Sequence, residues 1–301
     1  STNTTVGNDA LNENTTGGHN VAVGQGALSS NTTASGNTAV GRKSLNMTVS
    51  GDSNSGFGQY ALRKNTTGTQ NTAVGAQALY ENTTGSTNVA NGYRALYANT
   101  TGHSNVSIGW SSMLDNTTGY QNSAFGRDSL KANTTGIDNT ASGMGALRYN
   151  TTGNYNVANG YQALYTLTSG INNTAIGTFA LKQNTGNSNT GVGYLSLTNN
   201  STASSNTAVG AYSCYQTTTG NMNSAVGYGT LQNNTTGSNN VAVGWNALLS
   251  NTTGPFNIAI GRESLYSNTT GVDNTATGYQ SLYANTTGSY NSAYGRKSLF
   301  S

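Results

Sequence analysis

Short segments in which small apolar and polar residues alternate return at a fixed interval along the whole chain. One copy, residues 240–254, reads N-V-A-V-G-W-N-A-L-L-S-N-T-T-G. The alternation within its first five residues predicts a short strand, and the glycine that follows predicts a turn. The same glycines disfavour helix, so the chain is predicted to be all-β.

The interval is seventeen positions, as between Asn3 and Asn20, and we number each copy from its first Asn, which gives N-[TVS]-A-V-G-x-x-[AS]-L-x-x-N-T-T-G-x-x. One interval, from Asn173 to Asn189, is a single position shorter because the stretch at 184–186 lacks one residue, which predicts a turn that tolerates shortening. The 18 copies begin at Asn3, Asn20, Asn37, Asn54, Asn71, Asn88, Asn105, Asn122, Asn139, Asn156, Asn173, Asn189, Asn206, Asn223, Asn240, Asn257, Asn274 and Asn291.

A repeat of this length is too short for a pair of helices and suits one coil of a β-solenoid. We predict a β-solenoid, of the β-roll or β-helix type, with about 18 coils of about 17 residues stacked about 4.7–4.9 Å apart. Residues 1–301 are expected to form a single repeat array without capping sequences, either as a segment of a longer fibre or as a unit that stacks end to end.

Comparison of the copies indicates which positions face inward. Position 1 is Asn and position 5 is Gly in all 18 copies, position 3 is Ala in 14 and position 9 is Leu in 16. We expect Ala at position 3 and Leu at position 9 in a narrow core, and Asn at position 1 in a ladder of paired amides. Glycines at positions 5 and 15 are expected at corners with backbone angles that other residues avoid.

The charged residues predict the outward side. All 21 fall at positions 6, 7, 10, 11, 16 or 17, so these six positions are expected to face water. Position 4 varies in size and polarity, which indicates a less confined side and a candidate interface between chains. Because each coil buries only one leucine and a few small residues, association of several chains would stabilise the array.

Composition excludes several classes of protein. Hydrophobic residues make up 34% of the chain, below the ~45–50% typical of a globular domain with a thick core. A net charge of +3 offers no broad electrostatic footprint for nucleic acid, and no apolar run is long enough to insert into a membrane. The single cysteine cannot form an intramolecular disulfide.

No arrangement of residues suggests catalysis, so the chain is not expected to be an enzyme. His19 and His103 are far apart in the sequence and lie at exposed positions, and Cys214 occupies the leucine position as a buried thiol. The acidic residues form no recurrent pair or ladder, and His and Cys do not cluster. Neither a metal site nor a cofactor is expected.

Tyrosine and tryptophan recur at two of the outward positions and are the candidate binding residues. They predict two aromatic stripes that either pack one chain against another or stack on the sugar rings of a host glycan. At position 6 they are Tyr93, Trp110, Tyr161, Tyr194, Tyr228, Trp245 and Tyr279. At position 10 they are Tyr80, Tyr97, Tyr165, Tyr215, Tyr266 and Tyr283.

Thirteen copies carry the triplet N-[TS]-T at positions 12–14. The triplet is an acceptor sequence for N-glycosylation and is equally a turn motif. The candidate glycosylation sites are Asn14, Asn31, Asn65, Asn82, Asn99, Asn116, Asn133, Asn150, Asn200, Asn234, Asn251, Asn268 and Asn285.

The unit N-T-A-V-G-x-x-A-L-x-x-N-T-T-G resembles the repeats of phage tail-fibre and tail-fibre-like proteins. It is also similar to the head repeats of trimeric autotransporter adhesins, which fold as β-rolls in homotrimers. The resemblance covers the whole chain. It implies an extended, homotrimeric fibre outside the cell, on a virion tail or a cell surface, that provides reach and attachment.

These observations favour a structural and adhesive fibre shaft that attaches to a surface glycan or receptor by multivalent contacts. Its partners would be further copies of itself, in a homotrimer or an end-to-end filament, and no nucleic acid. One alternative is the subunit of a self-assembling extracellular filament, with or without glycosylation. A second is an ice-binding solenoid with threonine rows at positions 13 and 14.

Overall fold

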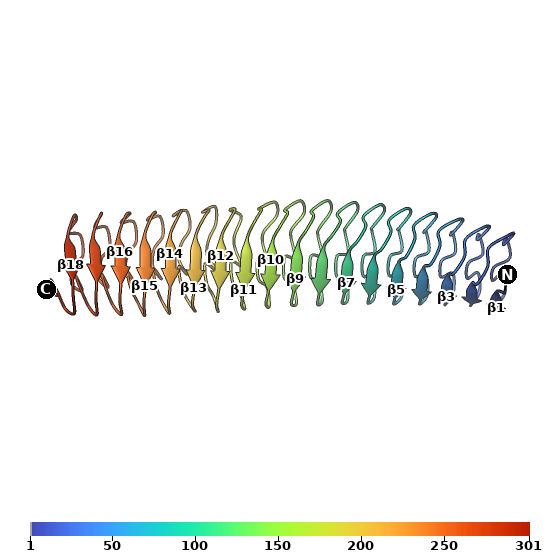
Figure 1. Ribbon diagram of the computed structural model, residues 1–301, viewed down its shortest axis with the longest axis horizontal. Coiled ribbons are helices and arrows are strands. Elements are labelled where there is room, and N and C mark those ends of the chain that lie inside the picture. The colour runs from blue at the N-terminus through green and yellow to red at the C-terminus, as the bar shows by residue number, and fades with distance from the viewer. Residues whose placement is uncertain (1) are drawn as a thin grey trace. The chain divides into compact units, whose positions relative to one another are not determined.

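The computed structural model describes residues 2–301 and divides into two compact units, one ending at Asn154 and the other beginning at Tyr155. Each unit is a stack of coils, with one three-residue strand and a series of turns per coil (Figure 1). No helix occurs within residues 2–301. The predicted all-β fold, a β-solenoid in which each repeat forms one coil, is confirmed.

The first unit contains nine strands. They are β1 (Thr4–Val6), β2 (Val21–Val23), β3 (Thr38–Val40), β4 (Ser55–Phe57), β5 (Thr72–Val74), β6 (Val89–Asn91), β7 (Val106–Ile108), β8 (Ser123–Phe125) and β9 (Thr140–Ser142). The second unit also contains nine. They are β10 (Val157–Asn159), β11 (Thr174–Ile176), β12 (Thr190–Val192), β13 (Thr207–Val209), β14 (Ser224–Val226), β15 (Val241–Val243), β16 (Ile258–Ile260), β17 (Thr275–Thr277) and β18 (Ser292–Tyr294).

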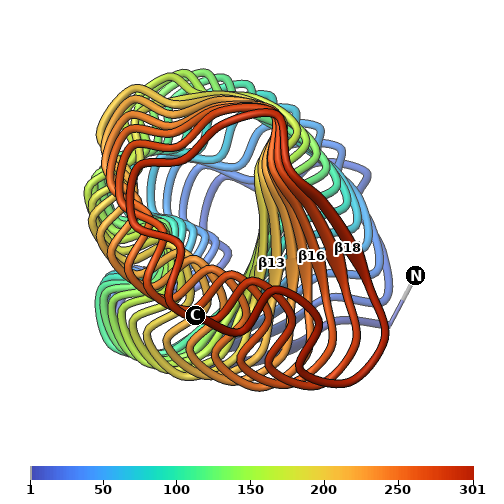
Figure 2. The ribbon, with the colours of Figure 1, turned by 90° about the vertical axis from the view of Figure 1, so that its left-hand side faces the viewer.

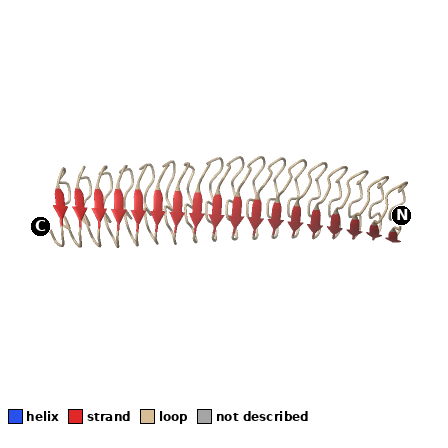
Figure 3. Ribbon diagram, in the orientation of Figure 1, coloured by secondary structure: helices blue, strands red, loops and turns tan. Residues whose placement is uncertain are grey.

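Within each unit, every strand pairs in parallel with the equivalent strand of the next coil (Figure 3). Ala22 pairs with Ala39, one repeat further on, and the register keeps equivalent positions side by side. The repeat that is one residue shorter does not disturb this register. Ala175 pairs with Gly191, which is 16 rather than 17 residues further on and also occupies position 3. Viewed along the stack, the strands of the second unit superpose on one side of the coil and the turns complete the outline (Figure 2).

In β2 to β18 the middle residue of the strand is buried and the residues on either side are partly or fully exposed, whereas all three residues of β1 are exposed. Position 3 alanines such as Ala39 and Ala259 have no exposed surface, whereas Phe57 and Ile260 at position 4 are about two-fifths exposed (42% and 41%). The expected alternation is confirmed. Positions 2 and 4 form a strand face that carries no charged residue in any copy.

The glycine at position 5 has a backbone conformation that other residues avoid. Its φ lies between 108° and 144° in all copies, and a Cβ on Gly109 would lie 2.5 Å from the carbonyl oxygen of Gly126 in the next coil. Both the angle and the space therefore require glycine, as expected.

The glycine at position 15 is required for a different reason from the expected one. Its φ is not in the left-handed region, but a Cβ on Gly119 would lie 2.5 Å from both the Gly136 carbonyl oxygen and the Asn116 Oδ1 atom. The constraint is close approach between coils rather than an unusual angle. Ala34 and Ala203 occupy this position in two copies and are 1% exposed, so the coil adapts locally.

Three other positions adopt positive φ without glycine, namely 7, 9 and 17. The position 9 leucines have φ between 46° and 55°, and those in the middle of each unit, such as Leu96 and Leu248, are completely buried. The left-handed conformation costs an ordinary residue about 1–2 kcal/mol, and burial of a leucine returns about 1.5–3 kcal/mol. The core leucine thus stabilises a turn that its own backbone disfavours.

The expected ladder of asparagines runs along position 1 in each unit. Asn88 is representative: its Oδ1 accepts the backbone N–H of Asn105 at 3.0 Å, and its Nδ2 donates to the carbonyl of Gly102 at 2.9 Å. Asn88 has no exposed surface. The interior of the coil is therefore held by side-chain amides as well as by alanine and leucine.

Candidate functional site

The candidate aromatic residues at positions 6 and 10 lie on the turns that follow each strand. The position 6 side chains are the more exposed set, with Tyr93 at 42%, Trp110 at 46% and Tyr228 at 48%. The position 10 tyrosines are half-buried. In both sets, rings at the same position in neighbouring coils contact each other, as Tyr80 contacts Tyr97 and Tyr93 contacts Trp110.

Rings stack more closely along position 10 than along position 6. The Tyr80 and Tyr97 rings are 5.2 Å apart between centroids and 12° from parallel, and the Tyr266 and Tyr283 rings are 5.1 Å apart and 10° from parallel. At position 6, Tyr228 and Trp245 stack at 6.5 Å. These separations fit the distance between coils, because rings at equivalent positions are offset by one coil.

A third aromatic row at position 7 joins the two predicted stripes into one surface. The Tyr212 ring contacts Tyr194 and Tyr228 of position 6 at 5.6 and 5.8 Å, and Tyr215 of position 10 at 5.9 Å. Burial and the neighbouring tyrosines Tyr194 and Tyr228 raise the pKa of Tyr212. We call positions 6, 7 and 10 together the aromatic surface.

Tyr60, Phe179 and Tyr212, the aromatic residues at position 7, were not among the predicted site residues. Position 7 adopts a positive φ of about 58–62° at these three residues. This backbone conformation cannot be predicted from a tyrosine or phenylalanine in the sequence. The usable signal was the recurrence of aromatic residues at position 7 in three copies.

Arginine and lysine side chains lie over these rings. The Arg94 guanidinium is 5.3 Å from the centroid of Tyr93 and 5.2 Å from that of Tyr97, so it lies between the two predicted stripes. Arg127 lies 4.8 Å from Trp110, and in the second unit Arg262 lies 4.7 Å from Trp245. The cations are electrostatically attracted to the ring faces, so the surface is both aromatic and cationic.

Position 7 is not uniformly water-facing, which corrects one expectation. Asp128 is only 5% exposed, and its carboxylate has Arg127 at 3.6 Å, Lys131 at 3.5 Å and Arg148 at 3.7 Å. Three cations compensate for the burial of one carboxylate, as a buried charge requires.

The candidate glycosylation sites at position 12 form a second ladder of asparagines. Asn99 Nδ2 donates to Asn82 Oδ1 at 2.8 Å and to the Gly102 carbonyl at 2.9 Å, and Asn99 has no exposed surface. Asn14 and Asn285 are partly exposed, and the others are buried in the same way. The Nδ2 atom, to which a glycan would be attached, is buried and hydrogen-bonded in the folded coil. Modification of the buried asparagines would therefore have to precede folding. Glycosylation stays a prediction.

The two threonine rows differ in their surroundings. Thr83 at position 13 donates its hydroxyl to the Thr100 carbonyl at 3.1 Å, and the bond recurs between other coils. Position 14 threonines such as Thr67 and Thr84 are exposed. Only one row therefore presents free hydroxyls, which disfavours a two-row ice-binding face.

The two histidines and the cysteine do not form a catalytic arrangement within the described residues. His19 and His103 are exposed, and the His103 ring stacks on Tyr120 at 4.8 Å. Cys214 is completely buried, and burial raises the pKa of its thiol to about 12, so it is protonated at neutral pH. Within residues 2–301 no three His, Cys, Asp or Glu side chains gather in a way that could hold a metal ion.

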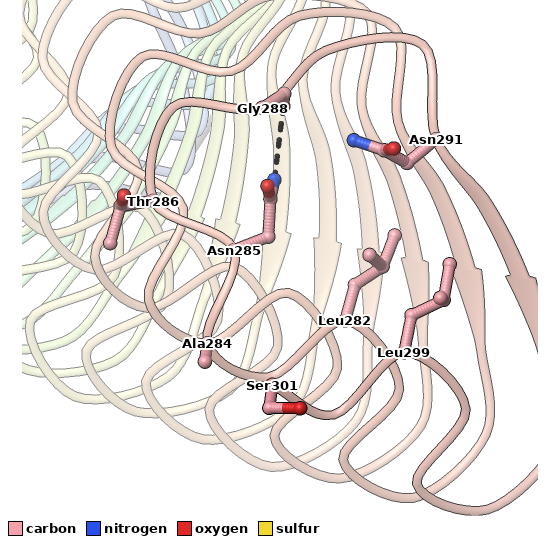
Figure 4. A pocket seen from close by; sticks show the side chains of 8 residues that line it. All are labelled: Leu282, Ala284, Asn285, Thr286, Gly288, Asn291, Leu299 and Ser301. Carbon is pink, nitrogen blue, oxygen red and sulfur yellow. Dashed lines mark hydrogen bonds between the residues drawn. The ribbon is translucent and has the colours of Figure 1, made fainter.

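One pocket lies among residues 282–301 (Figure 4). Leu282 and Leu299 line one wall, and Asn285 donates to the Gly288 carbonyl at 3.0 Å across from Asn291. These residues occupy positions 9, 12, 15 and 1, which form the coil interior elsewhere in the unit. The pocket is therefore the inside of the coil and not a separate binding site.

Comparison with known proteins does not assign the chain to a family. No protein-family model matches the chain, and no curated protein matches it. The part of the chain that the structure describes contains no long apolar helix that could cross a membrane.

Proposed function

We propose that this chain is a structural and adhesive fibre segment, located outside the cell, that attaches to a surface glycan through its aromatic surface. One observation carries the proposal: aromatic residues at positions 6, 7 and 10 recur along both units, and neighbouring rings stack at the coil spacing. Aromatic faces pack against the apolar faces of sugar rings, and a repeated site would sum weak contacts into avidity. No catalytic activity is proposed.

The strand face supports the proposal that several copies associate into a homotrimer. Val226, Val243 and Ile260 at position 4 are 43%, 38% and 41% exposed, and positions 2 and 4 carry no charge in any copy. A partner that covers a face repeating once per coil must repeat at the same spacing, and a second copy of this chain does so. The repeats that this unit resembles are trimeric, which favours three copies.

Affinity electrophoresis tests attachment. The protein is run in gels that contain hydroxyethyl cellulose, dextran or alginate, and at least one polysaccharide should retard it. The variant Tyr93→Ala, Trp110→Ala, Tyr228→Ala, Trp245→Ala should lose the retardation. The matched control Tyr155→Ala, Tyr290→Ala, which removes exposed rings at position 17, should keep it. Migration unaffected by every polysaccharide, or equal loss in both variants, would overturn the proposed attachment.

Light scattering tests association. A homotrimer should have a mass of three chains of 30.9 kDa, and the variant Val226→Lys, Ile260→Lys on the strand face should have the mass of one. Ser250→Lys at position 11 is the control and should remain a trimer. A single-chain mass for the unmodified protein would contradict the trimer, and a mass that grows with concentration would replace it with the self-assembling filament.

A further inference from the structure

Positive charge is confined to one side of the coil, which also carries six of the nine acidic residues. All 12 Lys and Arg residues lie at positions 6, 7, 10 or 11, whereas three of the nine acidic residues, Asp52, Asp138 and Asp273, lie at positions 16 or 17. On the cationic side the first unit has eight basic and five acidic residues, and the second has four and one. The two units therefore have the same net charge of +3 on this side, although their sequences reach it differently.

The basic residues are placed on the aromatic surface itself. Arg42 lies 5.6 Å from the Tyr60 ring, and Arg94 lies over both Tyr93 and Tyr97. In the second unit Arg262 lies between Trp245 and Tyr279, at 4.7 and 5.8 Å.

The charged ends of these side chains are accessible. The side chains of Arg127 and Arg262 are 62% and 59% exposed. Each contacts one carboxylate of the chain, Asp128 at 3.6 Å and Glu263 at 3.4 Å, and the remaining donors of each guanidinium group can bind an external anion. Ring faces and donors for an anion are thus presented side by side, once per coil in several coils.

We propose that the aromatic surface binds an acidic polysaccharide, a sugar chain that carries carboxylate or sulfate groups. Sugar rings would lie against the tyrosine and tryptophan faces, and the anionic groups would accept hydrogen bonds from arginine, which suits planar anions. This inference rests on the proposed function and specifies the ligand class of the same surface.

Charge density favours an acidic polysaccharide over nucleic acid. Nine coils at about 4.8 Å span about 43 Å, over which duplex DNA would present about 25 negative charges, one per ~1.7 Å. The net charge of +3 on this side of each unit is far too small to neutralise them. A sugar chain with one acidic group per sugar, or fewer, matches the sparse cations better, and its unsubstituted ring faces match the aromatic residues.

The test uses the full-length chain in gels that contain alginate, chondroitin sulfate, hydroxyethyl cellulose or no polymer. The variant Arg42→Gln, Arg94→Gln removes two cations from the surface and leaves in place Arg127, which compensates the buried Asp128 carboxylate. Glutamine occurs naturally at these positions, as Gln25, Gln59 and Gln77, so the coil should fold unchanged. Loss of charge-assisted hydrogen bonds should weaken binding to the acidic polymers about tenfold or more. Added salt should weaken the unmodified protein more steeply than the variant.

The matched control Asp52→Asn, Asp138→Asn changes net charge on the acidic side, where other copies carry Asn154 and Asn172. It should bind the acidic polymers as the unmodified protein does. Three results would overturn the inference: equal effects of both variants, tighter binding of the neutral polymer than of either acidic one, and tighter binding of oligothymidylate than of alginate. Of these, binding to the neutral polymer would leave the proposed function standing, whereas no retardation by any polysaccharide would remove both.

Discussion

Two ladders of asparagine run through each unit, and only one is ever interrupted. Position 1 is Asn in all 18 copies, whereas position 12 is Asn in 14 of its 17 copies and is replaced by Thr48, Leu167 and Thr217. Both ladders are buried, and both donate to the same carbonyl: Asn88 Nδ2 and Asn99 Nδ2 each lie 2.9 Å from the Gly102 oxygen. Burial and this shared bond therefore do not explain the difference.

The backbone partner explains it. The Asn105 backbone N–H at position 1 has the Asn88 side chain as its acceptor at 3.0 Å. At position 12 the Asn116 backbone N–H bonds to the Met113 carbonyl of its own turn, and the Asn99 Oδ1 atom accepts only a side-chain donor. Loss of a position 1 side chain would orphan a buried backbone donor, and such donors are rarely left unpaired. Asn is therefore invariant at position 1, where its side chain is the acceptor for a backbone N–H of the next coil, and is replaceable at position 12, where the backbone N–H bonds within its own turn.

The largest effect is expected when the first ladder is broken. Asn88→Thr removes the acceptor of the Asn105 N–H and a donor to the Gly102 carbonyl. The orphaned backbone N–H costs about 1–3 kcal/mol. The lost bond to the Gly102 carbonyl, which keeps Asn99 as a donor, costs about 0.5–1.5 kcal/mol, so the variant should lose about 2–4 kcal/mol of stability. The urea midpoint followed by circular dichroism measures it, with the outward substitution Val89→Thr as the control. A midpoint equal to that of the control would refute the role of the ladder.

The same substitution in the same coil at position 12 should cost less. Asn99→Thr reproduces what Thr48 and Thr217 do naturally and leaves every backbone N–H paired. The Asn82 Oδ1 atom loses its donor, which predicts a loss of about 1–2 kcal/mol. If Asn99→Thr proves as damaging as Asn88→Thr in the urea experiment, the distinction between the ladders fails.

Repairing an interruption should stabilise the first unit. Thr48 leaves its own Oγ1 and the Asn31 Oδ1 atom without hydrogen-bond partners, although both are buried. Thr48→Asn would connect Asn31 to Asn65 and should raise stability by about 0.5–1.5 kcal/mol. The control is Thr67→Asn at exposed position 14, which should leave the urea midpoint unchanged. A lower midpoint for Thr48→Asn would show that the ladder geometry is not restored.

The repeat made most of the fold predictable. Because 18 copies sample each position, the sequence alone separated the invariant Asn and Gly from the outward charged positions, and the strands lie where alternation placed them. The position 15 glycine shows the limit. Recurrence does not distinguish an unusual φ from a close approach between coils, and only the 2.5 Å distance from a Cβ on Gly119 to the Gly136 oxygen decides it.

The candidate site was less predictable because it depends on conformation rather than on residue type. Tyr212 has a positive φ at position 7 and lies between the two predicted stripes, and this conformation cannot be predicted from the residue type. The triplet at positions 12–14 has the same letters whether it accepts a glycan or builds a ladder. The burial of Asn99 shows that the triplet builds a ladder in the folded coil, and burial depends on the neighbouring coils.

Native-state amide hydrogen exchange tests the account most directly, because it reports on the backbone donor itself. In the unmodified protein the Asn105 N–H should be among the slowest to exchange in its unit. In Asn88→Thr its exchange should accelerate about tenfold or more, while the Asn116 N–H, bonded to the Met113 carbonyl, should change much less. Equal acceleration of both amides, or none at Asn105, would contradict the claim that the position 1 side chain is conserved for its backbone partner.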